Sequence, residues 1–298
     1  MRVTHKMLTD NYLSNLNKNL ATMQKSQEQI TGFSEILKPS DNPYEITRIM
    51  RMNSALKKSD QYLSNIDNSL GWLDATDTAI RSTVSAVQRV QELVTQGSSE
   101  TYSESQLIMI ADEISEIINE VTQYGNTSYQ GRYIFAGHNT IESPFEVNAG
   151  KEIVYSGGIT GDILTEISPG VTVSINIDAE DFLNPTGNVS IGETFQKVYD
   201  ALTTGDSSTL ATYAKEIEEQ MDAYLALASE VGAKTNRMES AKEKNKADTL
   251  NMTEILSSIK DIDLAEKTVE HSAMKAVYDA TLSIGGHILQ PTLLDYLR

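Results

Sequence analysis

Few side chains in this sequence have a spacing that could support metal chemistry. The four histidines are His5, His138, His271 and His287. They are far apart, and none has a second potential ligand one helical turn away. Because a lone histidine does not make a metal site, the pattern predicts no bound metal and no cofactor.

Two clusters of carboxylates are the remaining candidates for chemistry. Asp178, Glu180 and Asp181 lie close together in a segment that we expect to be a loop, without a nucleophile and base beside them. Asp261 and Asp263 resemble half of a calcium-binding loop, but the twelve-residue ligand spacing is absent. We interpret this second pair as a solvated step on a continuous helix. The sequence therefore predicts no catalytic residues and no enzyme.

A glycine pair near the C-terminal end, Gly285-Gly286, is a possible nucleotide-binding feature. Neither a dinucleotide-binding fingerprint nor a P-loop surrounds it. Because glycine weakens a helix, we interpret the pair as a hinge or helix interruption.

Long amphipathic helices must position these residues, because apolar side chains recur every seven residues at both ends of the chain. The first run, six of whose eight positions are apolar, comprises Leu13, Leu16, Leu20, Met23, Gln27, Ile30, Ser34 and Leu37. A second run has apolar residues at eleven of fourteen such positions in 49–94. A third follows one heptad position through 217–259 and continues almost to the C-terminus. Asn245 interrupts it, either as a buried residue that fixes register or as an exposed one.

Proline and glycine mark the predicted helix ends. Pro39 stops the first helix after about residue 37, and Asn42 with Pro43 supplies a cap and a first-turn proline for the next. A break at 96–99 precedes a third helix with apolar positions between Leu107 and Tyr124. Short loops of this kind favour antiparallel neighbours.

From about residue 129 the period changes to that of strands. Residues 132–137, 152–158 and the alternation across 171–177 are typical of short strands. Helix returns at about 192–202 and again after a break at 205–208. The fold class predicted is mainly α, an elongated helical bundle or coiled coil built from both chain ends, with a small β-rich domain inserted mid-chain.

Composition narrows the class of protein further. The 298 residues include no cysteine, which excludes disulfides, thiolate metal sites and cysteine nucleophiles. There is no run of eighteen apolar residues, so we expect no membrane insertion. Residues 1–10 lack the apolar core of a cleavable signal peptide, so the protein stays in the cytoplasm or leaves by a route that does not cleave its N-terminus.

Charge is distributed unevenly. The net charge is −18, whereas residues 1–60 carry nine Lys or Arg against six Asp or Glu. An acidic body excludes nucleic acid as a partner, because phosphate binding needs facing basic groups. The acidic surface is interpreted as a solubility feature rather than an acidic ligand site.

Five short motifs, in order along the chain, carry a family resemblance. Residues 39–43 (PSDNP), 61–66 (QYLSNI) and 73–77 (LDATD) look like the N-terminal signature of the bacterial flagellin superfamily, and 231–237 (VGAKTNR) with 262–266 (IDLAE) look like its C-terminal one. Asn42 stands where that family often has a second Asp, and it still caps a helix.

Further segments resemble one branch of that superfamily, the hook-filament junction proteins known as hook-associated protein 3. They are 1–4 (MRVT), 131–137 (GRYIFAG) followed by Thr140 and 144–145 (PF), and 293–297 (LLDYL). The resemblance implies a structural subunit between hook-associated protein 1 on the hook side and flagellin on the filament side. It also implies ring self-association, an export chaperone, and an extracellular place in the flagellum, reached without a cleaved signal peptide.

The same resemblance implies three domains. Residues 1–40 and 260–298 would form a terminal coiled coil, 41–130 and 193–259 a helical bundle, and 131–192 a β-rich outer domain. Apolar stripes on the terminal helices would stay partly disordered until neighbouring subunits bury them. The expected assembly surface comprises Leu13, Leu16, Leu20, Met23, Ile30, Leu37, Ile255, Ile259, Ile262 and Val269.

Three alternatives remain open at this stage. The nearest is flagellin itself, the filament subunit. A β-domain hydrolase acting on cell-wall material lacks catalytic residues, as described above. A signalling coiled coil is disfavoured by the missing membrane span.

Overall fold

The computed structural model describes residues 5–99, 102–156, 161–187 and 189–288. The chain divides into two compact units, one from 1–58 with 248–298 and the other from 59–247. Helices α2 (Pro43–Gly97) and α6 (Ser207–Lys260) contribute residues to both units.

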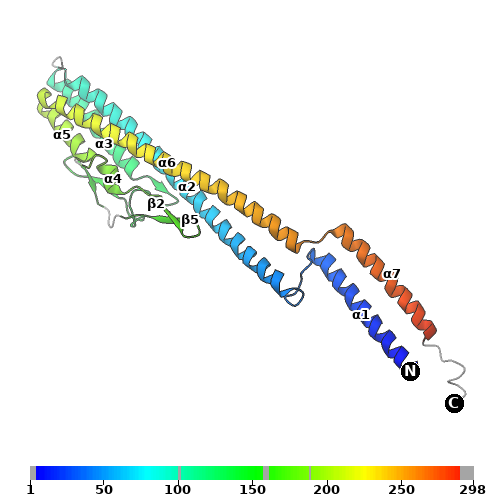
Figure 1. Ribbon diagram of the computed structural model, residues 1–298. Coiled ribbons are helices and arrows are strands. Elements are labelled where there is room, and N and C mark those ends of the chain that lie inside the picture. Colours follow the sequence, from blue (N-terminus) through cyan, green and yellow to red (C-terminus); the bar gives the residue numbers. More distant parts are fainter. Residues whose placement is uncertain (1–4, 100–101, 157–160, 188, 289–298) are drawn as a thin grey trace, which may run out of the picture. The chain divides into compact units, whose positions relative to one another are not determined.

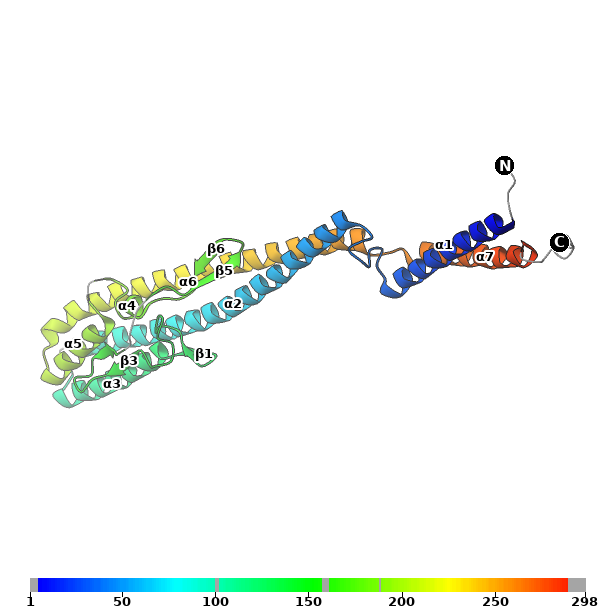
Figure 2. The same cartoon turned by 90° about the horizontal axis from the view of Figure 1, so that it is seen from below.

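The first unit contains a pair of antiparallel helices. Helix α1 (His5–Gly32) packs along α7 (Leu264–Ile288), and the two lie side by side in both views (Figure 1, Figure 2). The Tyr12 ring lies against Gly285 near one end of the pair. Ser34 forms an isolated antiparallel bridge with Asp261 near the other end. These two contacts fix the register of the pair.

The second unit is a helical bundle. Within it α2 and α6 run side by side (Figure 1, Figure 2). The Ser59 hydroxyl donates to Asn245 Oδ1 at 2.8 Å, and Lys242 pairs with Asp67 at 2.7 Å. Helix α3 (Glu104–Gly125) packs against α5 (Ile191–Thr204).

Three antiparallel hairpins and a short helix, α4 (Ala179–Leu183), form the β-rich part. The pairs are β1 (Ser128–Tyr129) with β2 (Arg132–Tyr133), β3 (Phe145–Val147) with β4 (Ile153–Tyr155), and β5 (Leu164–Ser168) with β6 (Val171–Ser174). A two-stranded hairpin is marginally stable alone in water. These hairpins therefore depend on packing against the helices.

The apolar core lies in the second unit, where it runs from Ile66 to Met238. At its centre Phe182 packs against Phe135, with 4.4 Å between ring centroids, and against Tyr224 at 5.9 Å. The Tyr224 hydroxyl donates to the Phe182 carbonyl oxygen. Burial raises the pKa of Tyr224, so the hydroxyl keeps its proton and remains a donor at neutral pH.

The helical periodicity predicted for these two helices is confirmed. All fourteen heptad positions in 49–94 are buried or half-buried, and so is every seventh residue in 217–245. Asn245, which the pattern left open, is buried and paired with Ser59. The sequence pattern thus identified the core face of both long helices.

The first helix ends earlier than predicted, at Gly32 rather than near residues 37–39. Phe33 adopts a left-handed backbone with φ of 49°, and the Ser34 amide donates to the Gln29 carbonyl at 3.2 Å. This is the hydrogen bond of a Schellman C-terminus. Glycine usually takes the left-handed position, and because a phenylalanine holds it here the stop signal was hidden.

The interpretation of 261–263 as a step on a continuous helix is wrong, because α6 ends at Lys260 and α7 begins at Leu264. Asp263 Oδ1 accepts the amides of Ala265 at 2.8 Å and Glu266 at 3.2 Å. The aspartate is therefore the N-cap of a new helix.

The predicted interruption at Gly285-Gly286 is also wrong, since α7 continues to Ile288. Gly285 is buried, and a Cβ there would collide with the Tyr12 ring. The glycine serves close packing between helices rather than bending.

The mid-chain strands are shorter than predicted. In 132–137 only the first two residues are strand; 134–136 are buried, and the Ile134 amide donates to the Thr127 carbonyl at 3.1 Å. Strand β6 ends at Ser174, and neither β3 nor β5 was predicted. The loop expected at Asp178, Glu180 and Asp181 is wrong, because Asp178 occupies the N-cap position of α4 and the other two lie in its first turn.

The Ser59–Asn245 pair gives a test of this packing. We expect Asn245→Ala to lower the free energy of unfolding by about 1–3 kcal/mol, because it removes a buried acceptor. Ser59→Ala with Asn245→Leu should cost less than the two single changes added together. Urea denaturation measures both, with Ser64→Ala at an exposed position of α2 as the control. Additive effects would contradict the coupling.

Candidate assembly surface

The two terminal helices contact each other through side chains that are only half-buried. Leu16, Leu20 and Met23 of α1 are half-buried, and so are Met274 and Tyr278 of α7. Burial of apolar surface is the main stabilising force for such a pair. The α1–α7 pair therefore gains little stability from its own contacts.

Full burial is almost absent from this unit. Among the described residues of 5–58 and 248–288, Ile49 is the one apolar side chain that is fully buried. Exposed large apolar side chains are common there, and include Met7, Leu8, Val277 and Ile284. The first unit therefore presents apolar surface that the chain itself does not cover.

The ten residues expected to form the assembly surface do not all lie in one seam. Leu13 is 46% exposed, Ile255 37% and Val269 71%. Leu37 lies in the loop after α1, because that helix ends at Gly32. The half-buried members are Leu16, Leu20, Met23, Ile30, Leu37, Ile259 and Ile262.

A second apolar face runs along α7, away from the half-buried seam. At 3.6 residues per turn its six side chains fall within about 100° of arc. All are exposed. We call them the α7 stripe: Val269, Ala273, Ala276, Val277, Ala280 and Ile284. The expected assembly surface includes Val269 together with the half-buried residues of the seam. The 3/4 spacing of the other members of the stripe is the signal that separates the two faces.

Charge differs sharply between the two units. Residues 1–58 and 248–298 carry 13 Lys or Arg and 13 Asp or Glu, whereas 59–247 carry 11 and 29. The net charge of −18 therefore belongs entirely to the second unit. Copies of the first unit can approach one another without net repulsion, while copies of the second repel.

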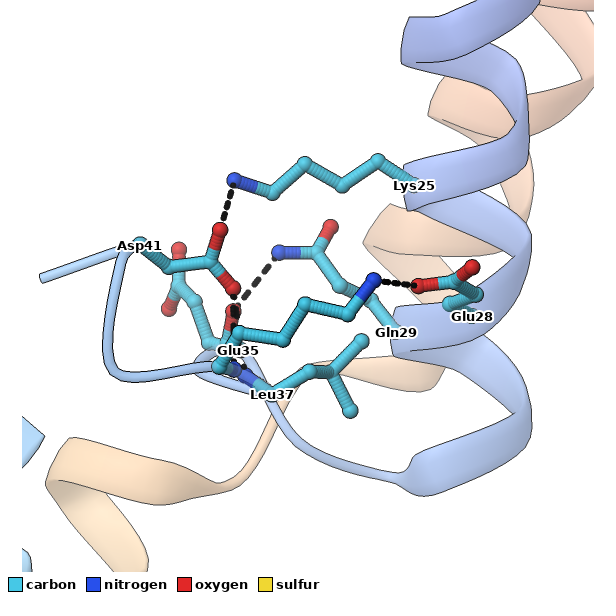
Figure 3. Close-up of polar contacts among 7 residues, drawn as sticks. Lys25, Glu28, Gln29, Glu35, Leu37 and Asp41 are labelled. Carbon is cyan, nitrogen blue, oxygen red and sulfur yellow. Dashed lines mark hydrogen bonds and ion pairs between the residues drawn. The ribbon is translucent and has the colours of Figure 1, made fainter.

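A polar loop, residues 33–42, follows α1; we call it the connector. Figure 3 shows its contacts with α1. Lys25 Nζ donates to Asp41 Oδ1 at 3.0 Å, and Gln29 Nε2 donates to the Glu35 carbonyl at 2.7 Å. The other Asp41 oxygen accepts the amide of Lys38 at 3.2 Å. The connector is thus held along the last turns of α1.

Asp41 is the central group of these contacts. The Lys25 ammonium, followed by the Lys38 amide, holds the pKa of the Asp41 carboxyl below its usual range. Asp41 is therefore charged at neutral pH. The adjoining Asn42 accepts the Glu45 amide at 3.3 Å, and α2 begins at Pro43.

The connector also contacts the α6–α7 break. The Glu35 amide donates to the Lys260 carbonyl at 2.7 Å, next to the Ser34–Asp261 bridge. The breaks in both chain halves are therefore joined backbone to backbone. Pro39 lies within the connector and cannot donate a backbone hydrogen bond.

Chemistry of other kinds has little support in the described residues. No three potential ligand side chains gather there in a way that could hold a metal ion. No helix within the described ranges is long and apolar enough to cross a membrane.

Comparison with known families agrees with this geometry. The bacterial flagellin N-terminal helical region matches residues 3–140, and the bacterial flagellin C-terminal helical region matches residues 214–297. Together they span well over half of the chain. The chain belongs to the bacterial flagellin family.

Individual members of the flagellin family align over most of the chain. Flagellar hook-associated protein 3 of Escherichia coli is 21% identical over 96% of this chain and 98% of that protein. Flagellin of Bacillus subtilis is 23% identical over 91% and 90%. The crystal structure of the flagellar junction protein FlgL from Legionella pneumophila has a TM-score of 0.59, at 14% identity, over 73% of this chain and 100% of that one. The structural likeness shows a common fold.

The Asp41 contacts predict a pH dependence of the connector. Because the folded-state pKa is lowered, their stabilisation is present above the unfolded value of about 3.9 and is lost as pH falls through the lowered pKa. Hydrogen exchange should show the Lys38 amide losing protection over that range.

At neutral pH we expect Asp41→Asn to lower the protection of the Lys38 amide severalfold, because the Lys25 ammonium then loses its charged partner. Glu28→Gln removes the exposed 3.1 Å pair with Lys38 and serves as the matched control. Equal losses in both variants would show that Asp41 has no special role.

Proposed function

We propose that this chain is a structural subunit of the bacterial flagellum and forms the junction between the hook and the filament. The exposed α7 stripe carries the proposal, because it is an apolar face on the charge-balanced unit that both chain ends build. Sequence similarity to flagellar hook-associated protein 3 over nearly the whole chain supports the junction role. The protein would act by association, without catalysis.

Burial of the α7 stripe would drive assembly. Full burial of a Val or Ile side chain is worth about 1.5–3 kcal/mol, and Val269, Val277 and Ile284 contribute three of them. A neighbouring copy supplies the partner surface that the α1–α7 pair lacks. The terminal helices would then gain order on assembly, and this confines growth to sites where a neighbour is present.

The acidic second unit would complement this arrangement. Its repulsion between copies disfavours lateral association through that unit and favours exposure to solvent. We infer that 1–40 with 260–298 form the inner coiled-coil domain, 41–130 with 193–259 the bundle, and 131–192 a β-rich outer domain.

The partners follow from the same proposal. Copies of this chain would form a ring that contacts hook-associated protein 1 on the hook side and flagellin on the filament side. An export chaperone would hold the subunit before secretion, and export would leave the N-terminus uncleaved. The protein would then function outside the cell.

Flagellin itself is the second candidate function. Similarity to Bacillus subtilis flagellin across 91% of this chain favours it. Both functions use the same terminal helices, so the position of the protein in the flagellum distinguishes them.

Electron microscopy of labelled flagella tests the junction directly. An epitope inserted at residues 169–170, an exposed turn between β5 and β6, should appear as a thin band at the hook-filament boundary. Label along the whole filament would contradict the junction role and support the flagellin role.

A substitution in the α7 stripe tests the assembly surface. Val277→Asp should abolish junction assembly and motility when it replaces the wild-type gene, because burying an unpaired charge is costly. The second unit should unfold at an unchanged temperature, since its core does not include this residue. Met109→Asp, at a 68% exposed position of α3, is the matched control and should leave motility intact. Motile cells carrying Val277→Asp would contradict the proposed surface.

A further inference from the structure

A cavity of about 460 Å³ lies in the second unit, where α2 meets the β1–β2 and β5–β6 hairpins. Its volume is within the range of small-molecule sites. Trp72 and Asn68 of α2 line it together with Tyr129 and Arg132 of the first hairpin. The junction function uses none of these side chains.

The β1–β2 hairpin places two of these groups side by side. Tyr129 and Arg132 are directly opposite in the antiparallel register, so their side chains share one face of the hairpin. The two-residue turn between them has φ of 52° at Gln130 and 78° at Gly131. A non-glycine residue in this region is strained, and such strain gathers at functional positions. Gln130 Nε2 donates to the Tyr129 hydroxyl at 3.1 Å.

The helix side of the cavity is shaped to receive Tyr129. Its phenol lies directly against Gly71, where any Cβ would collide with the ring. The same ring stands edge-on to Trp72, with 6.3 Å between centroids and 78° between planes. Trp72 is only 7% exposed, and its indole N–H has no acceptor among the described residues. Buried polar groups without a partner call for an explanation.

The lining is rich in polar groups and has no carboxylate. Among the described residues Arg132 forms no ion pair, and the side chains of Asn68 and Thr140 form no hydrogen bond to the protein. Arg132 and Asn68 are exposed to solvent at the cavity, and Thr140 is half-buried. One unpaired guanidinium, carboxamides and two aromatic rings therefore face the same space.

We propose that this cavity binds a hexuronic acid residue, a sugar ring that bears a single carboxylate. Arg132 pairs with the carboxylate in a charge-assisted contact. Asn68 and Thr140 exchange hydrogen bonds with ring hydroxyls, because a carboxamide and a hydroxyl can both donate and accept. The Tyr129 ring packs against the C–H face of the sugar, and the Trp72 indole N–H donates to a sugar oxygen.

The charge of the unit sets the ligand class. One guanidinium balances one carboxylate, whereas a polyphosphate would meet the uncompensated −18 of residues 59–247. A cationic ligand would find no acidic side chain in the lining. A neutral hexose would leave the guanidinium without its ionic partner.

The chain contains a single tryptophan, so fluorescence of the full-length protein reports on this cavity alone. Glucuronate and galacturonate should each produce a saturable change in Trp72 emission, and glucose should bind at least tenfold more weakly. The same titration is repeated with oligogalacturonate. Tighter binding of the oligomer than of the monosaccharide indicates a site for a polymer, and equal binding indicates a site for the free sugar acid. Chemical shifts of the Arg132 side chain provide a second readout of the same titration.

Arg132→Gln should weaken binding by about 10- to 100-fold, the factor expected for a hydrogen bond to a charged group. Arg237→Gln removes another arginine for which the described structure shows no ion pair, on α6, and should leave affinity unchanged. Gly71→Ala should displace the Tyr129 ring and weaken binding without a change in charge. Circular dichroism verifies that each variant is folded.

Three outcomes would overturn the proposal. They are no saturable change in either readout with any uronate, equal weakening by Arg132→Gln and Arg237→Gln, or glucose binding as tightly as glucuronate. The test is independent of the junction function, because it measures a purified subunit and neither α1 nor α7 contributes to the cavity.

Discussion

Burial of apolar side chains is the constraint on which the rest of this protein depends, and it is distributed unevenly along the chain. The core from Ile66 to Met238 lies within one unit, where α2, α3, α5 and α6 cover one another's apolar faces. The helices of the two chain ends have only each other, and one pair of helices cannot cover two apolar faces. Their half-buried seam and the bare α7 stripe follow from this shortage of partner surface. A subunit that remains incomplete until neighbours arrive is suited to assembly at a growing structure.

In the first unit, polar contacts rather than apolar packing set the local geometry. A Schellman end at Phe33, an aspartate cap at Asp263 and the Lys25–Asp41 contact define where helices stop and how the connector lies. These are short-range contacts with little buried area. They can fix local geometry without making the terminal helices rigidly stable, because exposed ion pairs contribute little free energy.

The second unit has an acidic surface but also a cavity whose lining carries no acidic side chain. Its surface repels other copies, while the lining around Trp72 and Arg132 contains no acid. Strand β2, which supplies Arg132 to this lining, belongs to the segment 131–137, whose resemblance to junction proteins was apparent in the sequence. The β1–β2 hairpin places the Tyr129 phenol against Gly71 of α2, with Arg132 opposite Tyr129 on the same face of the hairpin.

The heptad pattern determined much of this fold by itself. It identified the buried face of α2 and of α6 residue by residue, because a helix with one continuous partner must repeat its apolar residues at the helical period. The absence of cysteine and the order of short motifs pointed to structure and family. The pattern could not give the end of α1, since a backbone turn at Phe33 leaves no compositional trace. Nor could it tell whether Asp261 and Asp263 continue a helix or cap one, since both outcomes suit an aspartate. Tertiary structure alone decided which apolar face of α7 meets α1 and which is left bare, because that depends on the Tyr12–Gly285 contact between residues at opposite ends of the chain.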